Sequence, residues 1–75
     1  MMKLFRLKKS IRKYVHQRVA EVGDNEDLHD LGLDSLDFVE IVMEVEEEMD
    51  IHVEQVELRD ARTICDIFEI LKQKI

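Results

Sequence analysis

Apolar residues recur every three or four positions in two long stretches of the chain and again near its end. The first stretch predicts an amphipathic helix over residues 3–22, which Gly23 would end. The second stretch predicts a helix over residues 35–49. Asp34 is a suitable N-cap for this helix, and Asp37 lies three residues later, where its carboxylate would complete a capping box.

The remaining segments are less regular. Residues 24–34 predict a loop rich in Asp, Asn and Gly. Residues 51–62 are ambiguous, because their apolar positions fit either a short helical turn or a brief strand. Thr63 is the expected N-cap of the last helix, with Asp66 in the capping-box position. The expected core anchors of the loop are Leu28, Leu31 and Leu33, and those of the last helix are Ile64, Ile67, Phe68, Leu71 and Ile75.

Together these elements predict an all-α fold: a small four-helix bundle with three main helices, one short helix and a long first loop. At 75 residues the chain is expected to form one domain, residues 1–75, with a modest core. The absence of proline and the presence of only two glycines agree with a helical domain. The single cysteine, Cys65, excludes an internal disulfide and a multi-cysteine metal site.

Charge is distributed unevenly. Residues 1–20 carry seven basic and no acidic side chains, whereas residues 21–75 carry all 18 acids and four bases. The acidic part would repel nucleic acid and attract basic surfaces, although the first helix alone leaves binding to nucleic acid or a membrane open. The chain shows neither a secretory signal nor an apolar segment long enough to span a membrane. We therefore expect a cytoplasmic monomer.

The predicted helix of residues 35–49 has two apolar faces instead of one. Leu36, Val39 and Met43 form a short second stripe beside the core stripe, and the other positions are acidic. This second stripe either widens the core face or forms a docking surface rimmed by carboxylates. The core stripe consists of Phe38, Ile41, Val42, Val45 and Met49.

Ser35 stands between two aspartates at the junction of loop and helix, and three interpretations of it compete. It could cap the helix, act as a nucleophile, or accept a group from another enzyme. Catalysis is disfavoured, because the chain has no G-x-S-x-G elbow and no obvious base with an orienting partner. A calcium-binding loop is also disfavoured, because neither Asp24 nor Asp30 as its first residue places suitable ligands at the later positions.

The segment LGLDSLDFVEIVMEVEEEMDI resembles the signature of the acyl carrier proteins. Residues 30–36 match its D-L-G-x-D-S-L motif, and residues 37–48 continue with a similar acidic and apolar helix. The family is a four-helix bundle with a long first loop and a short third helix. By this resemblance, Ser35 matches the serine to which a magnesium-dependent transferase attaches 4′-phosphopantetheine from coenzyme A. The resemblance implies a carrier that is not itself an enzyme and holds no metal.

The resemblance also implies roles for other residues. The thiol of the arm, which is not Cys65, would carry acyl groups between enzymes of fatty-acid, related lipid or polyketide biosynthesis. Basic patches on the transferase and on these enzymes would bind the acidic helix. The expected docking residues are Asp34, Leu36, Asp37, Val39, Glu40, Met43, Glu46 and Glu47. The residues expected to line an acyl cavity are Phe38, Val42, Val45, Ile51 and Ile67.

Some features depart from the family pattern. The first loop is short for the family, Glu54 stands where a proline is common, and the first helix is unusually basic. These departures leave open a dedicated pathway, such as one that carries an aminoacyl group. An unmodified acidic adaptor, in which Ser35 only caps the helix, also remains open. If carboxylates steer the enzymes, salt and a Glu40→Lys substitution should both slow modification of Ser35.

Overall fold

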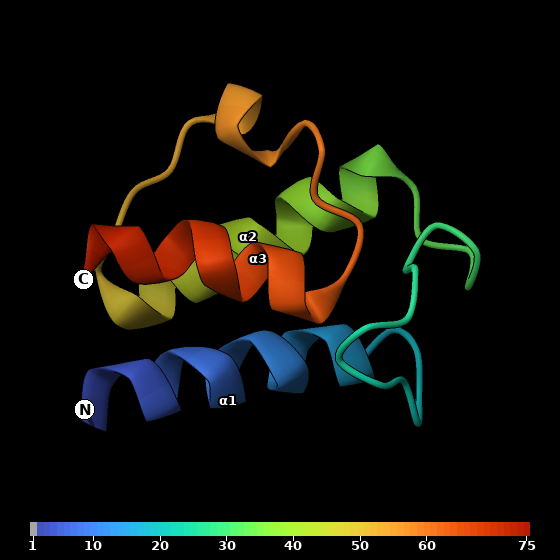
Figure 1. The fold of residues 1–75 in the computed structure, drawn as a ribbon, viewed down its shortest axis with the longest axis horizontal. Coiled ribbons are helices and arrows are strands. Elements are labelled where there is room, and N and C mark those ends of the chain that lie inside the picture. Colours follow the sequence, from blue (N-terminus) through green and yellow to red (C-terminus); the bar gives the residue numbers. More distant parts are fainter. Residues whose placement is uncertain (1) are drawn as a thin grey trace.

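The computed structural model describes residues 2–75, which form helices connected by loops (Figure 1). The α-helices span Met2–His16 (α1), Ser35–Met49 (α2) and Ile64–Leu71 (α3), and two 3-10 helices span Gln55–Leu58 (η1) and Lys72–Lys74 (η2). Residues 2–75 contain no strand, so the all-α prediction is confirmed, and η1 takes the place of the predicted short helix. Helix α1 packs against both α2 and α3, and η1 lies on the opposite side of the molecule from α1 (Figure 1).

Two capping boxes define the starts of α2 and α3. Asp34 accepts a hydrogen bond from the backbone of Asp37 (2.9 Å), and Asp37 accepts one from the backbone of Asp34 (3.1 Å). Thr63 and Asp66 exchange the same pair of bonds, at 3.0 and 3.2 Å. Each box satisfies two backbone N–H groups that the first helical turn leaves without partners. Both predicted N-caps are therefore confirmed.

Helix α1 is shorter than predicted, because it ends at His16 and not at residue 22. The backbone N–H of Arg18 bonds to the carbonyl of Val15 (2.9 Å), and Glu21 adopts a left-handed φ of 58°. The chain turns here and returns Val22 to the core, where it is buried. Side chains at helical spacing reach the core from such a turn as they would from a helix, so spacing alone overestimated the helix.

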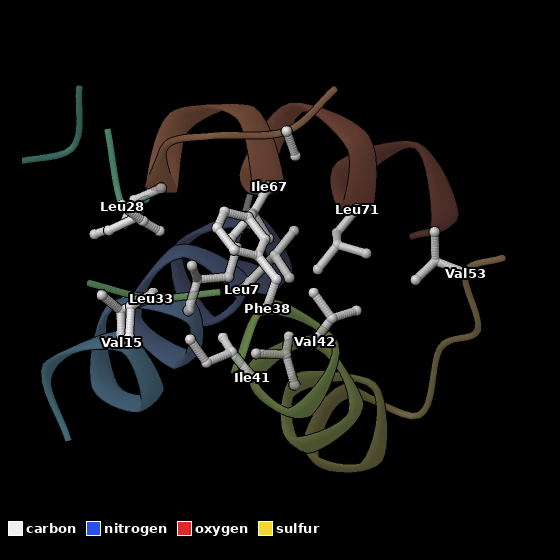
Figure 2. Close-up of a cluster of buried hydrophobic side chains, with 14 of the residues drawn as sticks. Leu7, Val15, Leu28, Leu33, Phe38, Ile41, Val42, Val53, Ile67 and Leu71 are labelled. Atoms are coloured by element: carbon white, nitrogen blue, oxygen red, sulfur yellow. The ribbon is translucent and has the colours of Figure 1, made fainter. Parts of the chain in front are cut away.

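The core lies where the three α-helices meet (Figure 2). Figure 2 shows Phe38 of α2 in the middle of the cluster, together with Leu7 of α1 and Ile67 of α3. The predicted core stripe of α2 is confirmed, with Met49 only partly buried at its end. Burial of these side chains is the main favourable contribution to folding in a domain of this size.

Two predicted core positions are wrong. Leu31 is 39% exposed, because the chain turns at Gly32, whose φ is +98°, and buries Leu33 instead. Ile75 is 42% exposed, because α3 ends at Leu71 and the chain continues as a 3-10 helix. A 3-10 helix has three residues per turn, so side chains after Leu71 leave the line of the core stripe.

The long loop is attached to the start of α3. The backbone N–H of Leu28 bonds to the carbonyl of Arg62 (2.8 Å), and the N–H of Cys65 bonds to the carbonyl of Asp24 (3.0 Å). The Leu28 side chain is completely buried. These contacts fix the segment that leads from α1 to Ser35.

Four of the seven bases in the first twenty residues form ion pairs within the molecule. Lys13 of α1 pairs with Glu48 of α2 (3.0 Å), and Arg18, in the turn that follows α1, pairs with Glu44 of α2 (3.1 Å). The other two bases pair with Asp24 in the loop. The basic first helix therefore balances part of the acidic charge of α2.

Glu48 makes the stability of the fold dependent on pH. Its carboxylate accepts hydrogen bonds from the Tyr14 hydroxyl (2.7 Å) and from Lys13 (3.0 Å), and these lower its pKa from 4.5 to about 2. Because the folded pKa is the lower one, the stabilisation is complete above about pH 5 and is lost as the pH falls towards 2. We expect the urea midpoint to fall across this range, and to fall less in Glu48→Gln.

The control for this measurement is Glu47→Gln, which removes the neighbouring carboxylate. Glu47 forms no ion pair or hydrogen bond within residues 2–75, so this variant should follow the wild-type acid profile. Identical acid profiles for wild type and Glu48→Gln would contradict the assignment.

Candidate functional site

Ser35 is the first residue of α2, and its side chain is exposed. The capping bonds are supplied by Asp34 and Asp37, and the Ser35 hydroxyl makes no hydrogen bond within the described chain. Hydrogen bonds from the backbone of Asp37 and from neighbouring groups hold the pKa of the Asp34 carboxyl below its ordinary value. Asp34 therefore stays ionised at neutral pH and keeps its capping role, which leaves the Ser35 hydroxyl free.

A groove with a volume of about 470 Å³ opens beside Ser35. We call it the Ser35 groove. It lies between the first turns of α2 and the connector that contains η1, and most of its lining is apolar. Its lining residues are His29, Ser35, Phe38, Val39, Gln55, Val56, Leu58, Arg59 and Ala61.

A second hollow of about 620 Å³ continues along α2. It shares four lining residues with the Ser35 groove, so the two form one path between α2 and η1: Val39, Gln55, Val56 and Leu58. Val42 and Val53 line the second hollow as well. This path begins beside Ser35 and is mainly apolar, although Glu46, His52 and Glu54 also line the second hollow.

The residues predicted to line an acyl cavity lie in different places. Phe38 lines the Ser35 groove and Val42 lines the second hollow. Val45 and Ile67 are completely buried in the core, and Ile51 packs against the core from its edge. The path instead includes Val56 and Leu58, which the sequence reasoning missed. Their signal was the apolar positions within residues 51–62, a segment whose pattern was ambiguous between a helical turn and a strand.

The second stripe of α2 faces solvent and does not widen the core. Leu36 is 64% exposed and Met43 is 58% exposed, whereas Val39 is half-buried beside the groove. Glu40 and Glu47 lie on the same outward side of the helix as Leu36 and Met43. Successive members of this set are four, three and four residues apart, which is the spacing of one helix face. We call these four residues the outer face of α2: Leu36, Glu40, Met43 and Glu47.

The carboxylates predicted for docking differ in what they contact. Asp34 and Asp37 form the capping box. Glu46 accepts a hydrogen bond from the backbone of Val53 (2.8 Å), which attaches the connector to α2. Glu40 lies 3.7 Å from Arg18, whereas Glu47 forms no ion pair within residues 2–75. Glu47 is therefore the carboxylate of the outer face with no competing contact in the described chain.

The histidines and the cysteine do not form a catalytic group with Ser35. His29 stacks on Phe38, with ring centroids 5.1 Å apart, and no histidine of the described residues forms a hydrogen bond to Ser35. Cys65 is half-buried in α3. Residues 2–75 hold no cluster of three potential metal ligands, and none of their helices has the length and apolar character needed to cross a membrane.

Known proteins resemble this chain over most of its length. Residues 6–71 match the family described as phosphopantetheine attachment site, which confirms the predicted cofactor, 4′-phosphopantetheine. The acyl carrier protein of Buchnera aphidicola subsp. Baizongia pistaciae is 34% identical over 74 residues, which cover 92% of this chain and 95% of that protein. The acyl carrier protein of Syntrophobacter fumaroxidans is 48% identical over 42 residues, which cover 56% of this chain and 52% of that protein. No solved structure matches the chain.

Proposed function

Because this chain belongs to the acyl carrier protein family, we propose that it carries acyl groups as thioesters on a 4′-phosphopantetheine arm attached to Ser35. The observation that carries the assignment is the Ser35 hydroxyl, which is exposed, makes no hydrogen bond within residues 2–75 and lies at an apolar groove. Asp34 and Asp37 already cap α2, so the helix does not need this hydroxyl.

Attachment of the arm requires only the Ser35 hydroxyl from this chain. When bound, the arm supplies a thiol that can hold an acyl group. The Ser35 oxygen would form a bond to the β-phosphorus of coenzyme A, while the pyrophosphate bond breaks and 3′,5′-ADP leaves. The hydroxyl proton would pass to a base of the transferase, which also supplies the magnesium. This chain needs neither group itself, in agreement with a carrier that other enzymes modify.

The outer face of α2 is the proposed docking surface for the transferase and for acyl-handling enzymes with basic patches. Leu36 and Met43 supply exposed apolar contacts, and a methionine side chain adapts readily to different partners. Glu40 and Glu47 supply charge that would steer a basic patch towards Ser35. Brief, charge-guided binding suits a shuttle that must leave each enzyme after the reaction.

We expect Glu47→Lys to slow modification of Ser35 by about three- to tenfold at low salt, because it reverses an unpaired charge on the docking surface. The measurement is the initial rate of transfer from coenzyme A at two salt concentrations. The wild-type rate should fall as salt rises, and the difference between the two proteins should shrink. Glu47 is a cleaner choice than Glu40, which lies beside Arg18.

Glu69→Lys is the matched control for charge, because it changes the net charge equally but lies on α3. Its transfer rate should stay close to that of the wild type. Transfer that is insensitive to salt, or an equal effect of both substitutions, would contradict steering by the outer face of α2.

The proposal is tested by incubating the protein with coenzyme A, magnesium and a broad-specificity phosphopantetheinyl transferase, followed by intact mass measurement. A gain of one phosphopantetheine group, mapped to the peptide that contains Ser35, is the expected result. The modified protein should then accept an acyl group that hydroxylamine removes, as it does from thioesters. An unchanged mass with several transferases would favour the unmodified adaptor.

The finer points of function stay predictions. They are a role in fatty-acid, related lipid or polyketide synthesis, the cytoplasmic location, the monomeric state and the single-domain organisation. The unusually basic first helix motivated the alternative of a dedicated aminoacyl carrier. Much of that charge pairs within the molecule, so it does not by itself favour the aminoacyl alternative.

A further inference from the structure

Arg59 lies in the acidic part of the molecule and forms no ion pair with any of residues 2–75. Residues 21–75 contain four bases and 18 acids. Arg62 pairs with Asp27 (3.6 Å), and both lysines of this segment pair with glutamates at 2.8 and 2.9 Å. Arg59 alone among these four bases has no carboxylate within ion-pair distance in the described residues. Arg59 is exposed, so its guanidinium is available to an anionic ligand.

The position of Arg59 agrees with such a ligand. Arg59 follows η1 directly and lines the Ser35 groove together with Ser35. None of the nine residues that line this groove is acidic, although the molecule as a whole carries a formal charge of −7. An exposed guanidinium beside a groove without carboxylates is a site for an anion, and guanidinium groups bind phosphate oxygens through paired hydrogen bonds.

We propose that Arg59 binds the phosphodiester that links the arm to Ser35, and that it thereby holds the arm along the Ser35 groove. This inference rests on the proposed function, because the phosphate is present only after Ser35 is modified. The apolar neighbours Val56 and Leu58 then lie beside the part of the arm that follows the phosphate. Arg59 is a positioning residue in this proposal, since it contacts the arm and takes no part in acyl transfer.

Arg59 is a better candidate for this contact than the other bases near the groove. Its backbone is helical, and its N–H bonds to the carbonyl of Val56, which fixes the start of its side chain at the rim of the groove. Arg62 lies only three residues away, but it is paired with Asp27 and does not line the groove. His29 lines the groove but stacks on Phe38, so it can only assist.

The contact is exposed, so it should be weak and sensitive to salt. A weak contact allows the arm to exchange between a held state along the groove and a free state. An enzyme docked on the outer face of α2 would draw the arm from the free state.

The test uses the full chain loaded with a fluorescent coenzyme A analogue by the transferase, with complete loading verified by intact mass. Time-resolved anisotropy then gives the ratio of held to free arm for wild type, Arg59→Gln and the control Arg62→Gln. Arg59→Gln should lower this ratio about two- to fivefold at low salt, as expected for an exposed ion pair. Arg62→Gln should match the wild type, and salt should bring the wild type close to Arg59→Gln.

A second measurement avoids the fluorophore. In ¹⁵N-labelled protein, the side-chain Nε–Hε signal of Arg59 should shift when Ser35 receives natural phosphopantetheine, whereas that of Arg62 should not. The role of Arg59 would be overturned if fully loaded wild type and Arg59→Gln had equal anisotropy and the Arg59 signal did not shift. The carrier function would remain intact in that case. Failure of the wild type to load would overturn both proposals.

Discussion

Ser35→Ala is expected to abolish attachment of phosphopantetheine completely while the protein stays folded. The substitution removes the oxygen that would form the bond to phosphorus, so no slower route remains. The fold should tolerate the change, because the capping bonds of α2 come from Asp34 and Asp37, and the Ser35 side chain is exposed. Alanine is also favourable in the first turn of a helix. Intact mass after incubation with coenzyme A, magnesium and transferase gives a yes-or-no result.

The matched control is Ser10→Ala, because Ser10 is the other serine of the chain. Ser10 is buried in α1, where a transferase cannot reach it, so this variant should gain the full mass of the arm. Circular dichroism of Ser35→Ala verifies that α2 is retained. A mass gain in folded Ser35→Ala would show that attachment occurs elsewhere, whereas loss of the gain in folded Ser10→Ala would contradict the assignment to Ser35.

Leu28→Ala is expected to destabilise the protein by about 3 kcal/mol, which is a large part of the stability of a domain of this size. The Leu28 side chain is completely buried, although it belongs to the long loop. Its backbone N–H bonds to the carbonyl of Arg62, and its own carbonyl accepts from Leu33 (3.1 Å). The truncation would leave a cavity where the loop, α3 and the approach to Ser35 meet.

Urea unfolding of Leu28→Ala and Leu31→Ala measures this effect. Leu31 lies three residues further in the same loop and is partly exposed, so its truncation should cost about 0.5 kcal/mol or less. Leu28→Ala should also slow modification of Ser35, because the loop that leads to the N-cap of α2 is no longer fixed. Equal midpoints for the two variants would contradict the view that Leu28 anchors the loop.

The sequence by itself determined the features that depend on near neighbours. The starts of α2 and α3 follow from the pairs Asp34–Asp37 and Thr63–Asp66, because a capping box involves residues only three positions apart. The buried stripe of α2 follows from the helical period, which repeats along the chain. The family resemblance also rested on one continuous segment of the sequence.

Only the tertiary structure decided the features that depend on distant segments. The end of α1 at His16 is set by a turn that returns Val22 to a core built by other helices. Whether Leu36 and Met43 lie inside or outside depends on which side of α2 packs against α1 and the rest of the core, and both prove exposed.

The Ser35 groove is the clearest case of a feature that requires the folded chain. It forms because residues 55–61 fold back beside the first turns of α2, some twenty positions earlier in the sequence. Local spacing contains no information about such a meeting, since it records only the direction in which each side chain leaves its own element. The position of Arg59 on the groove that Ser35 also lines follows from the same fold. The sequence therefore predicted the candidate attachment residue, and tertiary packing decided what lies around it.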